Sequence, residues 1–353
     1  MKKIFCFLLF LSLYSLQAEI LKEFDAEGLV TSEKNYIKKV LRSEKHFKQG
    51  KKHGVFKTYF PTGDTESETS YKDDKLDGLS NTYFKSGRLK RKEYYLDNKR
   101  EGIFRVYTKI GVLLKEGVYK NGERNGEFKR FYKTGELKSE KNYKNNKAEG
   151  EFLDYDRKGK IQTQKHYVKG NLISEKFYHN KLKVGTYKDF YDTGKVQKVY
   201  TYKKGVLEGP SNEYFNSGNL KSEKNYRNGK KHGIFSGYNE NGTLNSTFTY
   251  KMDTLKSEKR YKNGEKNGIF REYYDTGKLF TEISFKQNRQ EGKENCYFET
   301  GELKYEKNFK DGLQVGKYEE YFISGDLKLE ATYEKGLQEG NKKGYFENGK
   351  LKS

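Results

Sequence analysis

The sequence contains few of the residues that usually cross-link or stiffen a chain. Its 353 residues include no tryptophan, two prolines and two cysteines. One cysteine, Cys6, lies in the first 18 residues, so removal of that segment leaves Cys296 alone and excludes an intramolecular disulfide. No segment approaches the roughly 20 apolar residues that a membrane-spanning helix needs. Stability must therefore come from packing that requires neither cross-links nor long apolar segments.

Apolar residues make up 33% of the chain, and the formal charge is +22. This composition is typical of disordered chains, but aromatic residues contribute 16% and recur regularly. The positive charge indicates an anionic partner, such as lipid head groups, lipopolysaccharide, wall polymer or nucleic acid. The excess of lysine over arginine equally fits an A+T-rich coding sequence, so both explanations stay open.

The N-terminus has the order of a secretory signal peptide. Lys2 and Lys3 precede the mainly apolar stretch Ile4–Leu16, and Gln17, Ala18 and Glu19 follow. We predict a signal peptide at 1–18 with cleavage after Ala18, a retained anchor being the alternative, and a lead-in at 19–27. Loss of Lys2 and Lys3 lowers the charge from +22 to +20. Export to the periplasm, outer envelope or exterior follows.

Residues 28–353 form a repeat array, because segments such as 135–143 and 218–226 align at a fixed period. Twelve full units of 24 residues begin at Lys39, Gly63, Gly87, Gly111, Gly135, Gly170, Gly194, Gly218, Asp253, Gly277, Gly301 and Gly325. Three short units of 11 residues begin at Gly28, Gly159 and Gly242. Position numbers below count residues within a unit.

Three positions define the unit. Position 9 is always aromatic, position 16 is always glycine, and position 21 is always tyrosine or phenylalanine. The structural repeat positions are represented by Tyr119, Tyr143, Tyr226 and Tyr261 at position 9, and by Gly126, Gly150, Gly233 and Gly268 at position 16.

Each full unit predicts two strands. In the first, alternation is expected to place positions 3 and 9 on one face, as for Leu137 and Tyr143. Turns of the Asn121-Gly122 kind suit tight hairpins. Adjacent aromatics at positions 21 and 22 predict either a bulge or a sheet with aromatics on both faces.

The predicted fold class is all-β: an elongated antiparallel meander, a solenoid-like single sheet of stacked β-hairpins with about 27 strands. Each short unit then supplies one strand, which reverses the direction of all later strands of a given type. The position 9 aromatics on either side of each short step should lie on neighbouring strands, and any specialised binding surface is expected at these junctions. The aromatic pairs are Tyr36 with Phe47, Tyr167 with Tyr178, and Tyr250 with Tyr261.

The pattern Gly-x-Leu-x-x-Glu-x-x-Tyr-x-x-Gly-x-x-x-Gly-x-Phe-x-x-Tyr, clearest in residues 218–241, resembles the MORN repeat. It is similar to the bacterial variant in the YwqK family of proposed antitoxins. The resemblance implies elongated antiparallel sheets of stacked hairpins, and association with membrane lipids or proteins. It also implies toxin neutralisation as an alternative function.

Catalytic motifs are absent from the sequence. His53 and His232 precede the position 16 glycine and are interpreted as turn residues, and His46, His166 and His179 complete the set. Glutamate occupies position 6 in ten of the twelve full units, which favours a cross-strand ladder with lysines over a single active site. Cys296 is interpreted as incidental, with intermolecular pairing or redox chemistry as the alternative.

We therefore predict no catalytic, cofactor-binding or metal-binding residues and no cofactor. The predicted function is an exported, non-catalytic repeat scaffold that binds a protein or an anionic envelope or host component. The alternatives are a toxin-neutralising partner and a direct binder of anionic lipid or polysaccharide. Nucleic acid is disfavoured because of export and because arginine is scarce. The sequence leaves the oligomeric state open.

Overall fold

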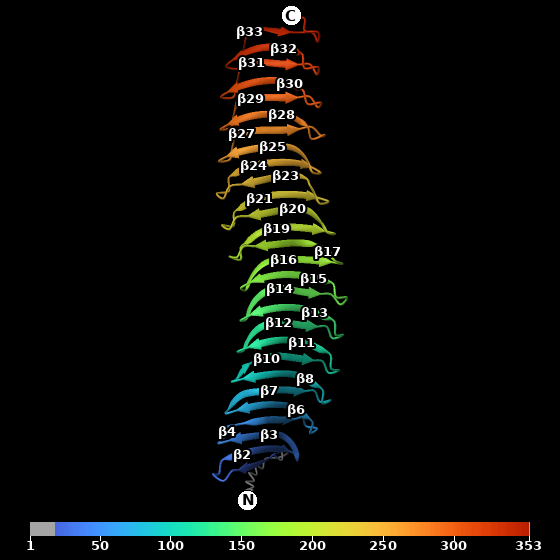
Figure 1. The fold of residues 1–353 in the computed structure, drawn as a ribbon, viewed down its shortest axis with the longest axis vertical. Helices are drawn as coiled ribbons and strands as arrows, with labels where there is room; N and C mark the ends of the chain where they lie inside the picture. The colour runs from blue at the N-terminus through green and yellow to red at the C-terminus, as the bar shows by residue number, and fades with distance from the viewer. Residues whose placement is uncertain (1–17, 353) are drawn as a thin grey trace. The chain divides into compact units, whose positions relative to one another are not determined.

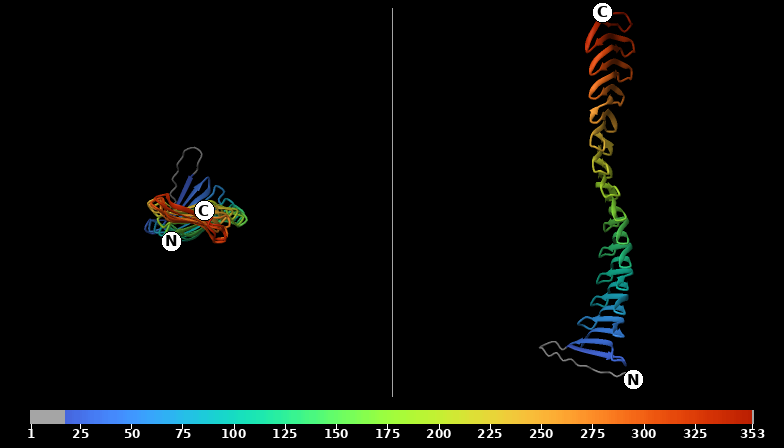
Figure 2. Two further views of the ribbon diagram at one scale, coloured as in Figure 1. Left: turned by 90° about the horizontal axis from the view of Figure 1, so that it is seen from above. Right: turned by 90° about the vertical axis from the view of Figure 1, so that its left-hand side faces the viewer.

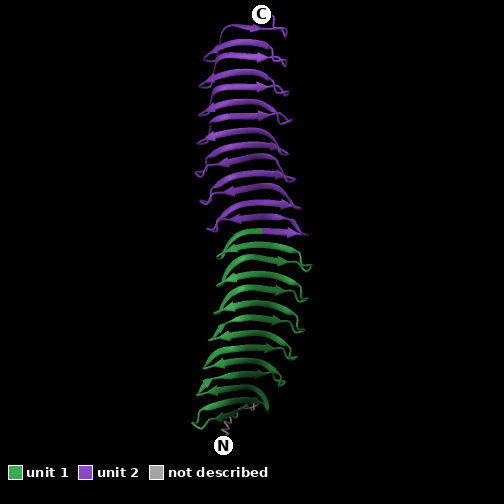
Figure 3. Ribbon diagram, in the orientation of Figure 1, with its two compact units in different colours: residues 1–175 green, residues 176–353 purple. Residues whose placement is uncertain are grey.

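The computed structural model describes residues 18–352, and the predicted signal peptide therefore lies almost entirely outside the described residues. The described part is all-β, and no helix of membrane-spanning length and hydropathy occurs in it. The chain divides after Glu175 into two compact units (Figure 3). These are called unit 1 and unit 2 by number, to distinguish them from the full and short repeat units.

Unit 1 contains the strands up to the start of β16, which includes the point of division. Their bounds are β1 (Ala18–Phe24), β2 (Val30–Ile37), β3 (Val40–Lys48), β4 (Lys51–Lys52), β5 (Gly54–Tyr59), β6 (Thr65–Lys72), β7 (Lys75–Tyr83), β8 (Leu89–Leu96), β9 (Lys99–Arg100), β10 (Gly102–Tyr107), β11 (Leu113–Lys120), β12 (Glu123–Phe131), β13 (Leu137–Lys144), β14 (Lys147–Tyr155), β15 (Ile161–Val168) and β16 (Asn171–His179).

Unit 2 continues with strands of the same two types. Their bounds are β17 (Leu182–Lys183), β18 (Gly185–Phe190), β19 (Val196–Lys203), β20 (Val206–Tyr214), β21 (Leu220–Arg227), β22 (Lys230–Lys231), β23 (Gly233–Tyr238), β24 (Leu244–Lys251), β25 (Thr254–Lys262), β26 (Glu265–Lys266), β27 (Gly268–Tyr273), β28 (Leu279–Lys286), β29 (Arg289–Tyr297), β30 (Leu303–Lys310), β31 (Leu313–Tyr321), β32 (Leu327–Glu334) and β33 (Leu337–Gly344).

Within each of the two compact units, the strands form an open antiparallel meander, in which each strand pairs with the next along the chain (Figure 1). This confirms the predicted fold class of stacked hairpins. Each two-residue strand continues, after one residue, into the strand that follows it. Counted in this way, the repeat region has the predicted 27 strands. The predicted lead-in also contains a strand, β1, which pairs with β2.

Two kinds of turn connect the strands. Positions 11 and 12 form a tight turn with positive φ at both residues, as at Asn121 (52°) and Gly122 (85°). At the other end of the hairpin, Tyr132 N–H donates to Glu136 O and Gly135 N–H donates to Tyr132 O. Gly135, at position 1, has φ 105°. Asparagine and glycine recur here because they adopt positive φ at the least cost.

The position 16 glycine lies in a bulge within the second strand. Gly117 pairs with Phe128 and Tyr119 pairs with Arg124, so Val118 alone opposes the three residues from Asn125 to Glu127. Gly126, the middle one, has φ 109°. The equivalent Gly150, Gly233 and Gly268 also have positive φ, at 72°, 86° and 100°. Glycine is required at this position because an L side chain in this conformation is strained.

A second irregularity corrects the expectation that positions 3 and 9 share a face. Arg130 pairs with Ser139 but Phe131 pairs with Leu137, so Lys138 at position 4 is an extra residue. Because side chains alternate along a strand, the extra residue puts Leu137 on the face opposite Tyr143. The bulge suspected near position 21 thus lies on the partner strand, and aromatics occupy both faces.

The buried side chains lie on one face of each strand. All the buried residues that the structure describes lie at positions 5, 7, 18 or 20, which share a face with position 9; they are Ser32, Glu93, Gly117, Ser139, Phe152, Tyr187, Phe235, Ser257, Phe270, Thr281, Cys296 and Ala331. We call this the ring face and the other the reverse face. Each of the two compact units is a single layer of strands, as the edge-on view in Figure 2 shows. Because no second layer of described residues covers the ring face, its side chains are buried by one another.

The short units at Gly28, Gly159 and Gly242 are single strands, β2, β15 and β24. Tyr36 and Phe47 lie on the paired strands β2 and β3, and Tyr250 and Tyr261 on the paired strands β24 and β25. The register nevertheless places Tyr36 opposite Leu41 and Tyr250 opposite Leu255, which are position 3 residues. The two rings of each pair therefore point to opposite faces. Of the third pair, Tyr167 lies in unit 1 and Tyr178 lies in unit 2.

Candidate binding surface

Rings of positions 9 and 18 form a continuous ladder on the ring face of unit 1. Successive centroids are 4.6–5.5 Å apart, in edge-to-face or tilted geometry, along Phe104, Tyr119, Phe128, Tyr143, Phe152 and Tyr167. Such pairs contribute about 0.5–1.5 kcal/mol each beyond the area they bury. The predicted repeat tyrosines Tyr119 and Tyr143 are thus members of the packed ladder.

The same ladder recurs in unit 2. Tyr226 contacts Phe235 at 5.5 Å, and Tyr261 contacts Phe270 at 5.5 Å. The repeat glycines lie in the bulges beside these rings, where the chain bends and position 14 is brought opposite position 9. Both sets of predicted repeat positions therefore build the ring face, the aromatics by packing and the glycines by backbone conformation.

A row of cations lies over the ladder at one edge of the ring face. The cation at position 14 stands over the position 9 ring of the next unit, as Arg124 does over Tyr143 at 4.0 Å. Five more pairs repeat the arrangement at 4.8–5.3 Å: Lys52 with Tyr71, Arg100 with Tyr119, Lys183 with Tyr202, Lys231 with Tyr250, and Lys266 with Phe285. A cation near a ring face gains from the ring quadrupole.

A second row runs along the other edge. Here the lysine at position 4, the extra residue of the bulge, lies over the position 22 ring of the preceding unit at 5.2–6.0 Å. The pairs are Lys90 with Phe84, Lys138 with Tyr132, Lys221 with Phe215, Lys304 with Phe298, Lys328 with Phe322, and Lys352 with Phe346. The ring face thus carries aromatic rings along its middle and cations along both edges.

Many of these cations have no acidic partner. Within the described residues, Lys52, Lys183, Lys231 and Lys266 are exposed and form no salt bridge. In unit 1 a pocket opens on this face, lined by Tyr119, Arg124, Phe128, Lys141 and Tyr143 among others. Ammonium groups that are held by a ring but lack a counter-ion have free donors for an anionic ligand.

The reverse face has a different character, because most of its position 6 glutamates are paired. Position 21 tyrosines donate to the position 6 glutamate of the same unit, as Tyr83 does to Glu68 at 2.9 Å and Tyr155 does to Glu140. Glu68 also pairs with Lys57 at 3.3 Å. Burial, followed by the hydrogen bond to Glu140, raises the pKa of Tyr155. The position 6 glutamates therefore belong to a repeated network of tyrosines and cations.

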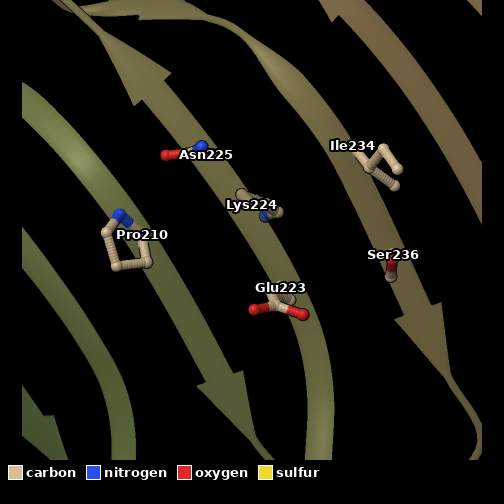
Figure 4. A pocket seen from close by; sticks show the side chains of 6 residues that line it. All are labelled: Pro210, Glu223, Lys224, Asn225, Ile234 and Ser236. Carbon is tan, nitrogen blue, oxygen red and sulfur yellow. The ribbon is translucent and has the colours of Figure 1, made fainter.

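Glu223 departs from this network. It is the one exposed member of the position 6 glutamates, and it has no hydrogen bond or ion pair in the described part of the chain. Position 19 supplies a cation in six of the twelve full units. Beside Glu223, Asn212 and Ser236 occupy it on the two flanking strands. Glu223 lines a shallow pocket together with Pro210, Asn225, Ile234 and Ser236 (Figure 4).

The histidines are dispersed along the chain. His53 and His232 are not turn residues: they precede the bulge glycine, and their N–H groups donate to His46 O and Asn225 O. His166 contacts Glu151 at 2.8 Å. No cluster of three or more potential metal ligands occurs in residues 18–352.

The cation rows are the feature that sequence reasoning missed. Lysine or arginine recurs at positions 4 and 14, which is the available signal. Its meaning depends on the two bulges, which bring these positions onto the ring face.

Comparison with known proteins identifies the repeat. The family model described as MORN repeat variant matches more than half of the chain, at residues 52–73, 124–145, 148–169, 183–204, 207–228, 231–252, 266–287, 290–311 and 338–353. Most of these segments begin at position 14 and end at position 11 of the next unit, so the family's repeat is a hairpin closed by the position 1 glycine turn. No curated protein matches the chain.

Solved structures give only distant similarity. The crystal structure of TcdB2-TccC3 without its hypervariable C-terminal region matches at 13% identity, covering 96% of this chain and 20% of that chain with a TM-score of 0.16. The TcdB2-TccC3-Cdc42 structure matches at 11% identity, covering 93% and 25%, with a TM-score of 0.15. The chain thus spans a quarter or less of those proteins. The repeated family matches, together with the stacked hairpins, show that this chain belongs to the MORN repeat variant family.

Proposed function

We propose that the chain is an exported, non-catalytic scaffold that binds an anionic envelope or host component through the cations of its ring face. The observation that carries the proposal is the pair of cation rows along the edges of the aromatic ladder. A repeated surface suits a repeated ligand, because each unit that carries the cation makes the same contact and the contacts add.

The spacing within a row favours a polymer. Successive repeat units are two strands apart, which is about 9.6 Å, twice the distance between neighbouring strands. Cations of one row that lie on the same face therefore recur at this spacing, as Arg100 and Arg124 do, or at a multiple of it. The single spacing is close to the length of a disaccharide, and sugar rings also stack on aromatic side chains. A linear polysaccharide with carboxylate, sulfate or phosphate groups is therefore the ligand class that we propose.

The test compares two sets of lysines in unit 2. The first set consists of position 14 lysines that lie over position 9 rings, namely Lys183, Lys231 and Lys266. The second set consists of position 10 lysines near the same edge on the reverse face, namely Lys203, Lys262 and Lys286. Each set is replaced by glutamine, so the change in charge is equal. Binding to heparin, a sulfated linear polysaccharide, is measured against ionic strength.

We expect the position 14 variant to bind heparin about tenfold more weakly, and the position 10 variant to bind almost as tightly as the unaltered chain. Binding should also fall steeply as salt screens the cations. Equal losses in the two variants would contradict a specific role for the ring face. Vesicles of phosphatidylcholine and phosphatidylglycerol in equal parts form a second arm, and stronger binding to them than to heparin would identify a lipid surface as the ligand.

Export is tested separately. We expect the mature protein to begin at Glu19 and to fractionate with the envelope or the medium. N-terminal sequencing that finds Met1 intact would contradict export by a cleaved signal peptide.

A further inference from the structure

The ring face changes sides within unit 2, at the short unit that begins with Gly242. In an antiparallel pair, residues directly opposite each other point to the same face. Within a regular hairpin, ring-face positions pair with one another, as Phe235 at position 18 does with Phe248 at position 7. Between β24 and β25, however, Phe248 pairs with Glu258, which is a position 6 residue.

Side-chain contacts across this pair agree with the register. Arg260, a reverse-face residue at position 8, lies over the Phe248 ring at 5.7 Å. Ser257 at position 5 donates to Thr249 at position 8, with 3.0 Å between the oxygens. The ring face of residues 253–352 is therefore on the side of the sheet that residues 176–252 present as their reverse face.

Chirality requires this exchange. One added strand reverses the direction in which later strands of each type run, while the sheet continues to grow the same way. Because the repeat is chiral, it can reverse its strands and still extend the sheet in the same direction only if it is rotated by 180° about the axis along which the strands stack. That rotation also exchanges the two faces of the sheet. The repeat lengths predict the reversal of direction, but the exchange of faces appears only in the register of the paired strands.

Both blocks of unit 2 have a complete ring face. Residues 176–252 place Lys183 over Tyr202 and Lys231 over Tyr250. Residues 253–352 place Lys266 over Phe285, and lysines over Phe298, Phe322 and Phe346. β24 and β25 pair over six residue pairs with one bulge at Lys256, so one sheet carries two such surfaces facing opposite ways.

We propose that unit 2 binds two anionic polysaccharide chains at once, one on each side of its sheet, and so bridges them. This inference rests on the proposed function of the ring face. A straight polymer cannot follow both surfaces without crossing the edge of the sheet, so each block takes its own chain. The 11-residue step converts a one-sided binder into a cross-linker.

The experiment removes the exchange of faces without removing the binding surfaces. Deletion of residues 253–263 takes out β25 and joins Met252 to Gly264. This makes one regular 24-residue unit with a Met-Gly turn, like the Lys204-Gly205 turn whose φ values are 50° and 89°. The control deletes residues 253–276, a full unit, and leaves the exchange of faces in place because Gly277 then follows Met252.

Both deletions are made in the full chain with Lys52, Lys90, Arg124 and Lys138 replaced by glutamine, so that bridging through unit 1 is suppressed. Heparin is coupled to beads of two colours. Capture of protein by one bead type reports binding, and pairing of the two colours reports bridging. Capture also serves as the check that each variant folds.

We expect the undeleted protein and the 253–276 deletion to pair the two colours. The 253–263 deletion should be captured equally well but pair the beads about tenfold less. Undiminished pairing by the 253–263 deletion, or capture without pairing by the undeleted protein, would overturn the bridging proposal alone. Absence of capture for every variant would instead overturn the proposed function.

Discussion

Cys296 shows how closely the ring face packs at a single position. It occupies position 20, has 2% of its surface exposed and lies opposite Thr281 on one strand and Tyr305 on the other. Burial raises the pKa of its thiol. Reactive cysteines are exposed and have lowered pKa values, so this environment favours a role in packing for Cys296 over intermolecular pairing or redox chemistry.

A prediction follows for its reactivity. In protein that lacks residues 1–18, Cys296 is the only thiol. We expect iodoacetamide at pH 8 to alkylate it roughly a hundredfold more slowly in the folded protein than in guanidinium, because the folded state limits both thiolate formation and access. Mass spectrometry of timed samples measures the rates. Rapid alkylation of the folded protein, or a disulfide-linked dimer on a non-reducing gel, would contradict a buried thiol.

At the scale of the element, each tight turn is held by the turn of the preceding unit. Asn146, at position 12, has φ 64°, and its Oδ1 accepts the N–H of Arg124 at 2.9 Å. Its own N–H donates to Arg124 O at 3.0 Å. Asp74, Asn98, Asp253 and Asn288 make the same side-chain contact in other units. The side chain thus adds a second hydrogen bond to the backbone one that joins the two hairpins at this edge.

We therefore expect Asn146→Ala to lower the free energy of unfolding by about 2 kcal/mol, from one lost hydrogen bond and a left-handed conformation that alanine tolerates poorly. Asn146→Asp is the matched control, because aspartate fills this position at Asp74 and Asp253, and its cost should be well under half as large. Urea denaturation of both variants measures the difference. An equal loss in the two would show that the acceptor oxygen does not matter.

The same elements show what sequence reasoning reaches. The 24-residue period, the turn residues and the aromatic position 9 predicted the strands and their order, because turn chemistry and alternation are local. The extra residue at Lys138 was missed because Gly-x-Leu-Lys-Ser reads as regular alternation; only pairing with Phe131 reveals the shift. Since faces and cation rows depend on that shift, the binding surface could not be assigned before the register was known.

At the scale of the whole molecule, contacts within each of the two compact units join neighbouring strands. Among the described residues, no central core is shared by segments that are distant along the chain. Stability is then a sum over hairpins and their interfaces. Cooperativity in such arrays weakens with length, so a single free energy of unfolding is not expected to describe the chain.

We expect urea unfolding to be broad, with an apparent m value well below that of a two-state protein of this size. Circular dichroism and tyrosine fluorescence, which this tryptophan-free chain permits, should give transitions that do not coincide. A single steep transition shared by both probes, with the m value expected for the full surface, would show that all the hairpins unfold together.

The 11-residue step also bears on how such arrays diversify. Gain or loss of eleven codons in frame adds or removes one strand, and every hairpin downstream keeps its own neighbours, turns and packing. One small genetic event therefore inverts the outward side of all later repeats at almost no cost in folding. Under the proposed function, such a step changes the number of ligand chains that the array binds while the sequence of each repeat remains the same.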